Sequence, residues 1–303
     1  MMQQQTGTLK LYILMVIAML CWSFSLIWTK IALVSFPPVT LITLRLTLAS
    51  FFLFLFLKTT GKLQRIEKGD LKLFLLLAFF EPFLYYIGET YGLTMVMPTL
   101  ASVIVALIPV FAPFFAFAFL KEKLSLANFI GIIISVLGVY LIVSQGSDSS
   151  STSLKGVLLL LLAAFSAIIY GLILRKIPAK YSATTIIYYQ SLLGLIYFVP
   201  SVLLIDRVKL PHIQIYGEAV AAVLMLTIFA SVIAFVLFAD AVRKIGIAKS
   251  QVFTNLIPVF TALFSWVLFK EILNLLQWMG VLVVVVGVFF SQKKAGTAGF
   301  LTR

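Results

Sequence analysis

The chain has 303 residues, of which 62% are hydrophobic and only 11% are charged, with 23 Lys and Arg against 10 Asp and Glu. Soluble globular proteins contain about 45–50% apolar and about 25% charged residues, so this composition excludes a water-soluble domain. The single cysteine, Cys21, lies in an apolar segment, which excludes an intrachain disulfide and a cysteine-based metal site.

Ten apolar runs follow one another along the chain. A helix needs about 20 mostly apolar residues to cross a hydrocarbon core of about 30 Å. The ten runs cover residues 11–32, 39–57, 71–91, 99–120, 126–144, 154–174, 183–205, 218–241, 247–269 and 275–291. The first is too long for the apolar core of a signal peptide and ends without a small-residue cleavage site, so we interpret it as a retained span. The pattern predicts an all-α polytopic membrane protein with ten transmembrane helices.

The connections between the runs are short. None approaches the roughly 50 residues of the smallest domains, so a separate nucleotide-binding domain has no room. The phosphate-binding pattern G-x-x-x-x-G-K-[ST] does not occur in the sequence either. We therefore expect that any transport by this chain is not driven by its own ATP hydrolysis.

The basic residues are distributed unequally between the two sides of the predicted membrane. With ten spans both termini share a side, and that side collects 17 of the 23 Lys and Arg residues, against five on the opposite side and Arg45 inside a span. Because short cytoplasmic loops carry the excess of Lys and Arg, this distribution predicts cytoplasmic termini in the inner (cell) membrane. The net charge of +13 then reflects membrane topology, and no nucleic-acid partner is needed to explain it.

An internal repeat relates the two halves of the chain. Residues 107–111 recur as residues 256–260, and at the same offset of 149 Lys121-Glu122 matches Lys270-Glu271. Two glycine pairs keep this offset too, namely Gly131 with Gly280 and Gly138 with Gly287. Each repeat holds five spans, an odd number, so residues 146–303 are predicted to be inverted relative to residues 1–145 within one bundle. Inverted repeats are typical of secondary transporters whose substrate site lies near the midplane between the halves.

The duplicated Pro-Val-Phe, Lys-Glu and paired-glycine pattern resembles the EamA domain of the drug/metabolite transporter superfamily, present as two tandem copies over nearly the whole chain. In relatives the Lys-Glu position is usually a small residue followed by Glu. The resemblance implies ten helices, cytoplasmic termini, a central cavity and export of small metabolites such as amino acids. It also implies a structural role for Glu122 and Glu271, which match the recurring acidic position of the family.

Acidic residues in the third run are the main site candidates. Glu81, Tyr85 and Glu89 share one helical face with Gly88, and Pro82 frees the carbonyl of the residue four positions earlier. Ionisable groups at membrane depth cost about 2.5–3.5 kcal/mol on insertion scales and usually face a cavity or a partner. One interpretation makes Glu81 and Glu89 partners for a substrate cation or a coupling proton. The alternative is that they are neutral or paired and hold helices together.

The other charged residues of the spans favour structural roles. Arg45 is expected to pair with a carboxylate or with carbonyl groups at a helix end. Asp240 is expected to form a boundary ion pair with Arg243 or Lys244, and Lys30 can extend to the membrane interface.

The fourth and ninth runs both carry prolines, but the ninth run has a more polar helical face than its repeat mate. Pro109, Pro113 and Pro258 predict kinks or hinges, as Pro82 does in the third run. Gln251 and Asn255 share a face of the ninth run and are candidate substrate contacts, with hydrogen bonding between helices as the alternative.

Three aromatic residues and the paired glycines also have expected positions. Trp22, Tyr86 and Tyr170 are expected near the cavity. The glycine pairs of the fifth and tenth runs are expected to allow close helix packing.

Together these features predict a secondary transporter that exports small metabolites by alternating access, with the lipid bilayer as its environment and protons as a candidate coupling ion. The single histidine, His212, falls in an exterior connection, and neither H-E-x-x-H nor G-x-S-x-G occurs. We therefore predict no enzyme activity, no cofactor and no metal. A channel-like pore and a non-transporting interaction protein on the same fold are the alternatives.

Overall fold

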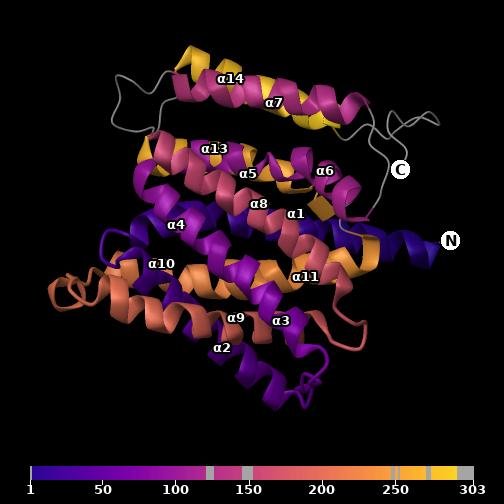
Figure 1. Ribbon diagram of the computed structural model, residues 1–303, viewed down its shortest axis with the longest axis vertical. Coiled ribbons are helices and arrows are strands. Elements are labelled where there is room, and N and C mark those ends of the chain that lie inside the picture. Colours follow the sequence, from indigo (N-terminus) through magenta and orange to yellow (C-terminus); the bar gives the residue numbers. More distant parts are fainter. Residues whose placement is uncertain are drawn as a thin grey trace.

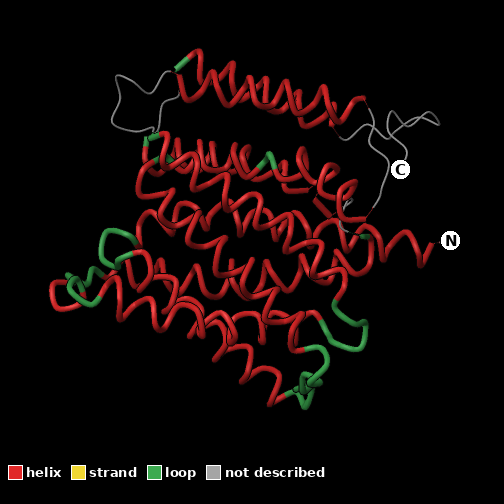
Figure 2. Tube along the Cα trace, in the orientation of Figure 1, coloured by secondary structure: helices red, strands yellow, loops and turns green. Residues whose placement is uncertain are grey.

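The computed structural model describes residues 2–120, 126–144, 153–246, 250–251, 253–270 and 274–291. The structure is all-helical, with 85% helix and no strand in these residues. The helices lie side by side along a common direction (Figure 1), and their connections gather at the two ends (Figure 2). In a lipid environment this is the expected solution, because a helix satisfies its backbone hydrogen bonds internally.

The elements follow the predicted runs closely. The first half contains α1 (Met2–Ala32), α2 (Pro38–Thr59), α3 (Leu71–Ala78), the π-helix η1 (Phe79–Leu84), α4 (Tyr85–Met95), α5 (Pro98–Val105), α6 (Ile108–Leu120) and α7 (Leu126–Ser144). The second half contains α8 (Leu154–Lys176), α9 (Ala183–Ser201), η3 (Val202–Asp206), η4 (Leu210–His212), α10 (Gly217–Met225), η5 (Leu226–Ala234), α11 (Phe235–Ile245), η6 (Phe253–Asn255), α13 (Leu256–Phe269) and α14 (Leu275–Ser291). The segments η3 and η5 are also π-helical, and η4 and η6 are 3₁₀ turns.

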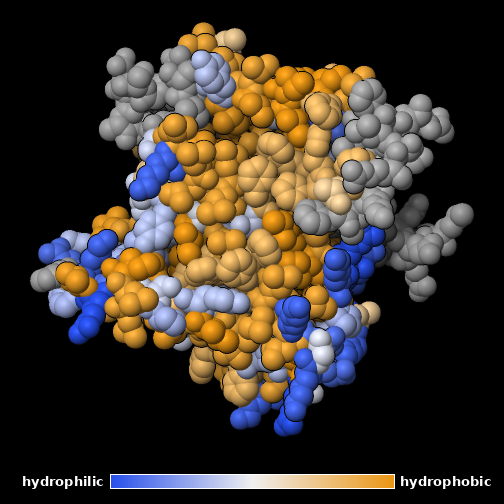
Figure 3. Space-filling model, in the orientation of Figure 1, coloured by the Kyte–Doolittle hydropathy of each residue, from blue (hydrophilic) through white to orange (hydrophobic). Residues whose placement is uncertain are grey.

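Seven helical segments of the described chain are long and apolar enough to cross a membrane, and three shorter apolar helices accompany them. The seven are Lys10–Ala32, Pro38–Thr59, Leu71–Met95, Pro98–Phe115, Leu154–Lys176, Ala183–Asp206 and Gly217–Ile245, and the shorter ones are Leu126–Leu141, Phe253–Phe269 and Trp278–Phe290. Apolar side chains cover the middle of the visible face, while hydrophilic side chains gather toward the ends of the helices (Figure 3). This arrangement describes a multi-pass membrane protein.

The paired glycines lie where α7 and α14 pack together. A Cβ atom at Gly138 would lie 2.7 Å from the carbonyl oxygen of Gly280 and 2.7 Å from the backbone nitrogen of Val284. A Cβ atom at Gly287 would likewise lie 2.7 Å from the carbonyl oxygen of Gly131. The prediction that these glycines allow close helix packing is confirmed.

Three of the four predicted hinge prolines lie at helix breaks. Glu81, just before Pro82, has a non-helical backbone (φ −144°, ψ 117°) inside η1. The fourth run breaks between α5 and α6, immediately before Pro109, and Pro258 is the third residue of α13 after the turn η6. Pro113 instead lies within α6, which continues past it, so this proline marks no helix boundary.

Two charged side chains cap helices at one end of the bundle. The predicted run over residues 183–205 stops short of Asp206, but η3 extends the helical segment to this residue, and its side chain is fully buried. Its Oδ2 accepts hydrogen bonds from the backbone N–H (2.8 Å) and the hydroxyl (2.9 Å) of Thr40, near the start of α2. Lys30, near the end of α1, caps a second helix. Its Nζ donates a hydrogen bond of 2.8 Å to the carbonyl of Leu93, which lies in the last turn of α4. Both charges complement the helix dipoles at those ends.

Replacing Gly138 with alanine tests the packing of α7 against α14. In an unconstrained helix Gly→Ala stabilises, whereas here the Cβ atom meets backbone that cannot rotate away, so we expect a loss of about 1–3 kcal/mol. Thermal unfolding in detergent should show a lower Tm by about 2–4 °C per kcal/mol. Gly217→Ala is the control, because a Cβ atom there has open space around it. An unchanged or higher Tm for Gly138→Ala would contradict the packing.

Candidate functional site

A cavity lies in the middle of the bundle and is lined by side chains from both halves of the chain. Its walls come from α1, α2, the span from η1 to α4, α5 and α6, and from α8, α11, η6 and α13. About 60 Å³ is free for the centres of water-sized molecules. One water requires about 10–15 Å³ by this measure, so in this conformation the cavity has room for several waters, and a metabolite requires it to widen.

Two carboxylates face this cavity. Glu81 and Glu89 both line it and are 4% and 3% exposed. Glu81 lies at the irregular point of η1, and Glu89 lies on α4, where its Oε1 accepts a hydrogen bond of 3.1 Å from the Tyr85 hydroxyl. The position of η1 depends on α9, because Pro82 packs directly on Gly194 of α9. A Cβ atom added at Gly194 would lie only 2.5 Å from the Cγ of Pro82.

Arg45 on α2 brings a positive charge to the same cavity. It is 3% exposed, and its Nε donates a hydrogen bond of 2.7 Å to the Ser231 hydroxyl on η5, in the other half of the chain. Its guanidinium carbon lies 4.2 Å from the centre of the Tyr86 ring, a cation–π contact. Nη1 lies 3.8 Å from Glu89 Oε2, which is within ion-pair distance but too long for a hydrogen bond.

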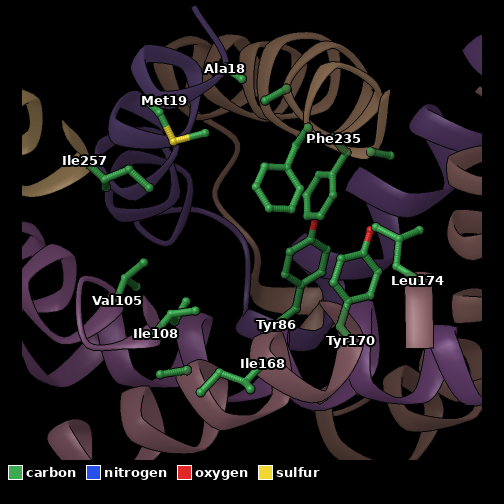
Figure 4. Close-up of a cluster of buried hydrophobic side chains, with 14 of the residues drawn as sticks. Ala18, Met19, Tyr86, Val105, Ile108, Ile168, Tyr170, Leu174, Phe235 and Ile257 are labelled. Atoms are coloured by element: carbon green, nitrogen blue, oxygen red, sulfur yellow. The ribbon is translucent and has the colours of Figure 1, made fainter. Parts of the chain in front are cut away.

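Aromatic rings form much of the remaining wall. Trp22 meets Phe235 at 5.1 Å between ring centres and Phe238 at 5.0 Å, and Tyr170 meets Phe235 edge-on at 6.5 Å. Figure 4 shows that the hydroxyls of Tyr86 and Tyr170 point the same way, toward the side on which Phe235 lies. The cavity thus combines three ionisable groups with a largely aromatic surface.

The structure brings together six of the seven predicted site residues. The cavity is lined by Trp22, Glu81, Tyr85, Glu89, Tyr170 and Gln251. Asn255 does not line it; Asn255 is half-buried, and Thr254 and Ile257 occupy the wall instead. None of Pro82, Pro109, Pro113 and Pro258 lines it, and Glu122 and Glu271 lie outside the described residues.

Sequence reasoning missed several contributors. Arg45 was expected to be structural, and it does contact Glu89, but it also lines the cavity. Phe235 and Phe238 lie in apolar runs without any local marker, whereas Thr254 belongs to the polar face of the ninth run but was not among the site candidates. The predicted pair between Asp240 and Lys244 is confirmed at 2.6 Å, in agreement with a role away from the cavity.

A polar network joins two connections at one end of the bundle. It links the segment between α2 and α3 with the segment between α8 and α9, and we call it the inter-loop network; it consists of Gln64, Glu67, Asp70, Lys180, Tyr181, Ser182, Thr185 and Arg243. Lys180 Nζ lies 2.7 Å from Glu67 and 2.8 Å from Asp70, and the buried Tyr181 donates a hydrogen bond of 2.7 Å to Asp70. Arg243 donates to the carbonyls of Ala179 and Tyr181.

Two charges of this network, those of Asp70 and Lys180, are stable over a wide pH range. The hydrogen bond from Lys180, aided by that from Tyr181, lowers the pKa of Asp70 below its ordinary value of 3.8. The hydrogen bonds to Asp70 and Glu67 raise the pKa of Lys180 above its ordinary value of 10.5. The contribution of Asp70 is lost only as the pH falls through its lowered pKa, and that of Lys180 only as the pH rises through its raised pKa. Between about pH 4 and pH 10 both groups are charged and the network persists.

Comparison with known proteins identifies the family. Residues 9–144 and residues 154–292 each match the EamA-like transporter family, so the chain belongs to this family and carries its domain twice. A protein of Archaeoglobus fulgidus, named an uncharacterized transporter, is 27% identical over 287 residues, which are 94% of this chain and 98% of that protein. The uncharacterized transporter YetK of Bacillus subtilis is 26% identical over 290 residues, which cover 93% and 87% of the two chains.

A solved structure supports the same fold. A crystal structure matches this chain with a TM-score of 0.66 at 18% sequence identity, covering 93% of this chain and 96% of that one. The likeness in fold extends over nearly the whole length of both chains.

Replacing Gln251 and Asn255 separately tests which side chain faces the substrate. Gln251→Ala removes a hydrogen-bonding group from the cavity wall, so the substrate concentration at half-maximal transport should rise about three- to tenfold. Asn255→Ala is the matched control: it should leave that concentration within about twofold and act on stability. Transport by both variants in proteoliposomes measures the difference, and equal effects would contradict the assignment.

Proposed function

We propose that the protein is a secondary transporter that exports small metabolites, amino acids or related compounds, across the cytoplasmic membrane by alternating access with proton coupling. The observation that carries this proposal is the buried cavity between the two halves, which holds Glu81, Glu89 and Arg45 at the middle of a multi-pass bundle. Charges at membrane depth are costly and mark substrate or proton pathways.

The proposed architecture is ten spans in two inverted repeats of five, at residues 1–145 and 146–303. The helix contacts support it, because the contacts of α8 in the second half repeat those of the equivalent helix α1 in the first. The third span contacts α8 through α4, and its counterpart, the eighth span, contacts α1 through α10 and η5. The fourth span contacts α8 through α5 and α6, and its counterpart contacts α1 through α13. The pairs α2 with α9, α5 with α13 and α7 with α14 join equivalent spans directly. A cavity at the interface of such repeats is where substrate sites lie in transporters of this design.

The proposed orientation places both termini on the cytoplasmic side of the cell (inner) membrane. The excess of Lys and Arg in short connections supports this orientation. It puts the inter-loop network on the cytoplasmic side, where it ties the first half to the second. We propose that these contacts hold the cytoplasmic ends of the two halves together in one conformation, and that transport requires them to separate.

Proton coupling is assigned to the cavity carboxylates. Asp70 and Lys180 of the inter-loop network keep their charges between about pH 4 and pH 10, so we do not assign proton coupling to this pair. Glu81 and Glu89 are the two acids of the cavity wall. A carboxylate that binds either a proton or the cationic group of a substrate couples the two movements.

The variants Glu81→Gln and Glu89→Gln in proteoliposomes test this proposal. Each removes a carboxylate while preserving its size, so transport driven by a pH gradient should fall about tenfold or more. Glu218→Gln is the matched control, because Glu218 is an exposed acid in the first turn of α10. Unchanged flux and an unchanged response to the pH gradient in both cavity variants would contradict carboxylate coupling.

Counterflow separates a carrier from an open pore. Unlabelled substrate inside the vesicles should accelerate the uptake of labelled substrate from outside. The reason is that an alternating-access carrier changes the side to which its cavity opens faster with substrate bound than when empty. A channel-like pore shows no such acceleration. No flux with any compound of a broad metabolite panel would favour a non-transporting membrane protein.

A further inference from the structure

The three charged groups of the cavity differ in how completely they are paired. We propose that Arg45 binds a carboxylate of the substrate, and that the cavity selects a small molecule with one carboxylate and two ammonium groups, of net charge +1. This inference rests on the transporter function proposed above and specifies the substrate class of the same cavity.

Arg45 has unused hydrogen-bonding capacity directed at the cavity. A guanidinium group carries five N–H donors in a planar fork. Among the described residues only the Nε donor has a hydrogen-bond partner, the hydroxyl of Ser231. The Tyr86 ring packs on the face of the group, so the ring holds the plane of the fork without using its N–H groups. The terminal nitrogens of Arg45 therefore remain available for a planar anion.

The contact with Glu89 does not satisfy this capacity. Hydrogen-bonded guanidinium–carboxylate pairs lie at about 2.7–2.9 Å, whereas Arg45 Nη1 lies 3.8 Å from Glu89 Oε2. Glu89 Oε2 is itself buried without a hydrogen-bond partner among the described residues, since the Tyr85 hydroxyl binds the other oxygen. Arg45 lines the cavity and its terminal nitrogens form no hydrogen bond with Glu89, so they are left for an anion that enters.

Charge balance sets the net charge of the bound molecule. With Glu81 and Glu89 ionised, the two acids and Arg45 carry a formal sum of −1 inside a buried cavity. An uncompensated charge in such a low-dielectric site is costly, so the cavity is stable with one added positive charge. One proton supplies this charge, and so does one molecule of net charge +1. The proton and the substrate then exclude each other, which produces exchange.

The pattern of groups refines this charge into a substrate class. Two acids complement two ammonium groups, and the guanidinium complements one carboxylate. The aromatic wall of Trp22, Phe235 and Phe238 offers an apolar surface for a methylene chain between them, with ring faces that also attract ammonium groups. A monoamine monocarboxylate leaves one acid unpaired, and a diamine without a carboxylate leaves Arg45 unpaired.

Three probes of similar length test the proposal in counterflow with proteoliposomes: lysine (net +1), cadaverine (net +2) and norleucine (net 0). The wild-type protein should exchange lysine at least about tenfold faster than either analogue, because only lysine pairs all three groups. Arg45→Gln changes the formal sum to −2 and removes the carboxylate site. The preference should then reverse, with cadaverine exceeding lysine by about tenfold.

Arg45→Lys controls for charge, since it keeps the positive charge without the planar fork of N–H donors. This variant should still exchange the substrate lysine faster than cadaverine, but with a smaller ratio of the two rates than the wild type. Monodisperse elution and an unchanged Tm establish that each variant is folded, and if Arg45→Gln is unfolded, the ratio for Arg45→Lys decides. An unchanged lysine-to-cadaverine ratio in the folded variants overturns the inference, as does a wild type that exchanges other metabolites but not lysine. Absence of exchange for every compound overturns the transporter function instead.

Discussion

The structure depends on the compensation of charge at membrane depth within the protein. Arg45 on α2, Glu81 on η1 and Glu89 on α4 converge on one cavity, and Arg45 reaches Ser231 in the other half through a single hydrogen bond. Because the core of a bilayer offers these groups no bulk water to screen their charges, the helices that carry them must stay within reach of one another. The same requirement makes the cavity responsive: a proton or a charged molecule that enters changes the balance that holds the two halves together.

Close helix packing gives these groups their positions. Glycines remove the side chain where α7 meets α14, and Gly194 lets α9 pack directly on Pro82, beside Glu81. Since apolar side chains gain little from leaving lipid for protein, membrane helices associate through such contacts and through hydrogen bonds. At one end Asp206 caps α2, and at the other the inter-loop network joins segments 60–70 and 177–185. The α2–α9 pair is therefore tied at both ends, across the two halves of the chain.

Much of this could be predicted from the sequence, for physical reasons that also explain the failures. Apolar runs predicted the helices because lipid leaves the backbone no other partner, and Glu81 and Glu89 were found because an acid in such a run is costly. Asn255 does not line the cavity, because the 3₁₀ turn Phe253–Asn255 departs from the spacing of an α-helix and Thr254 takes the wall position. The predicted run stops short of Asp206 because a π-helix extends α9 beyond its apolar residues. Ser231 and Phe235 carry no local signal, since only the packing of η5 and α11 against other helices brings Ser231 to Arg45 and Phe235 to the cavity.

The central claim is that one cavity opens to the two sides of the membrane in turn. Side-specific labelling tests it most directly, with Ser25→Cys in the cavity wall as the reporter in a Cys21→Ala background and a membrane-impermeant maleimide applied to vesicles of each orientation. The account predicts labelling from both sides, and it predicts that Asp70→Asn with Tyr181→Phe raises labelling from the cytoplasmic side while lowering it from the other. Labelling from one side only, or a simultaneous rise from both sides, would contradict it.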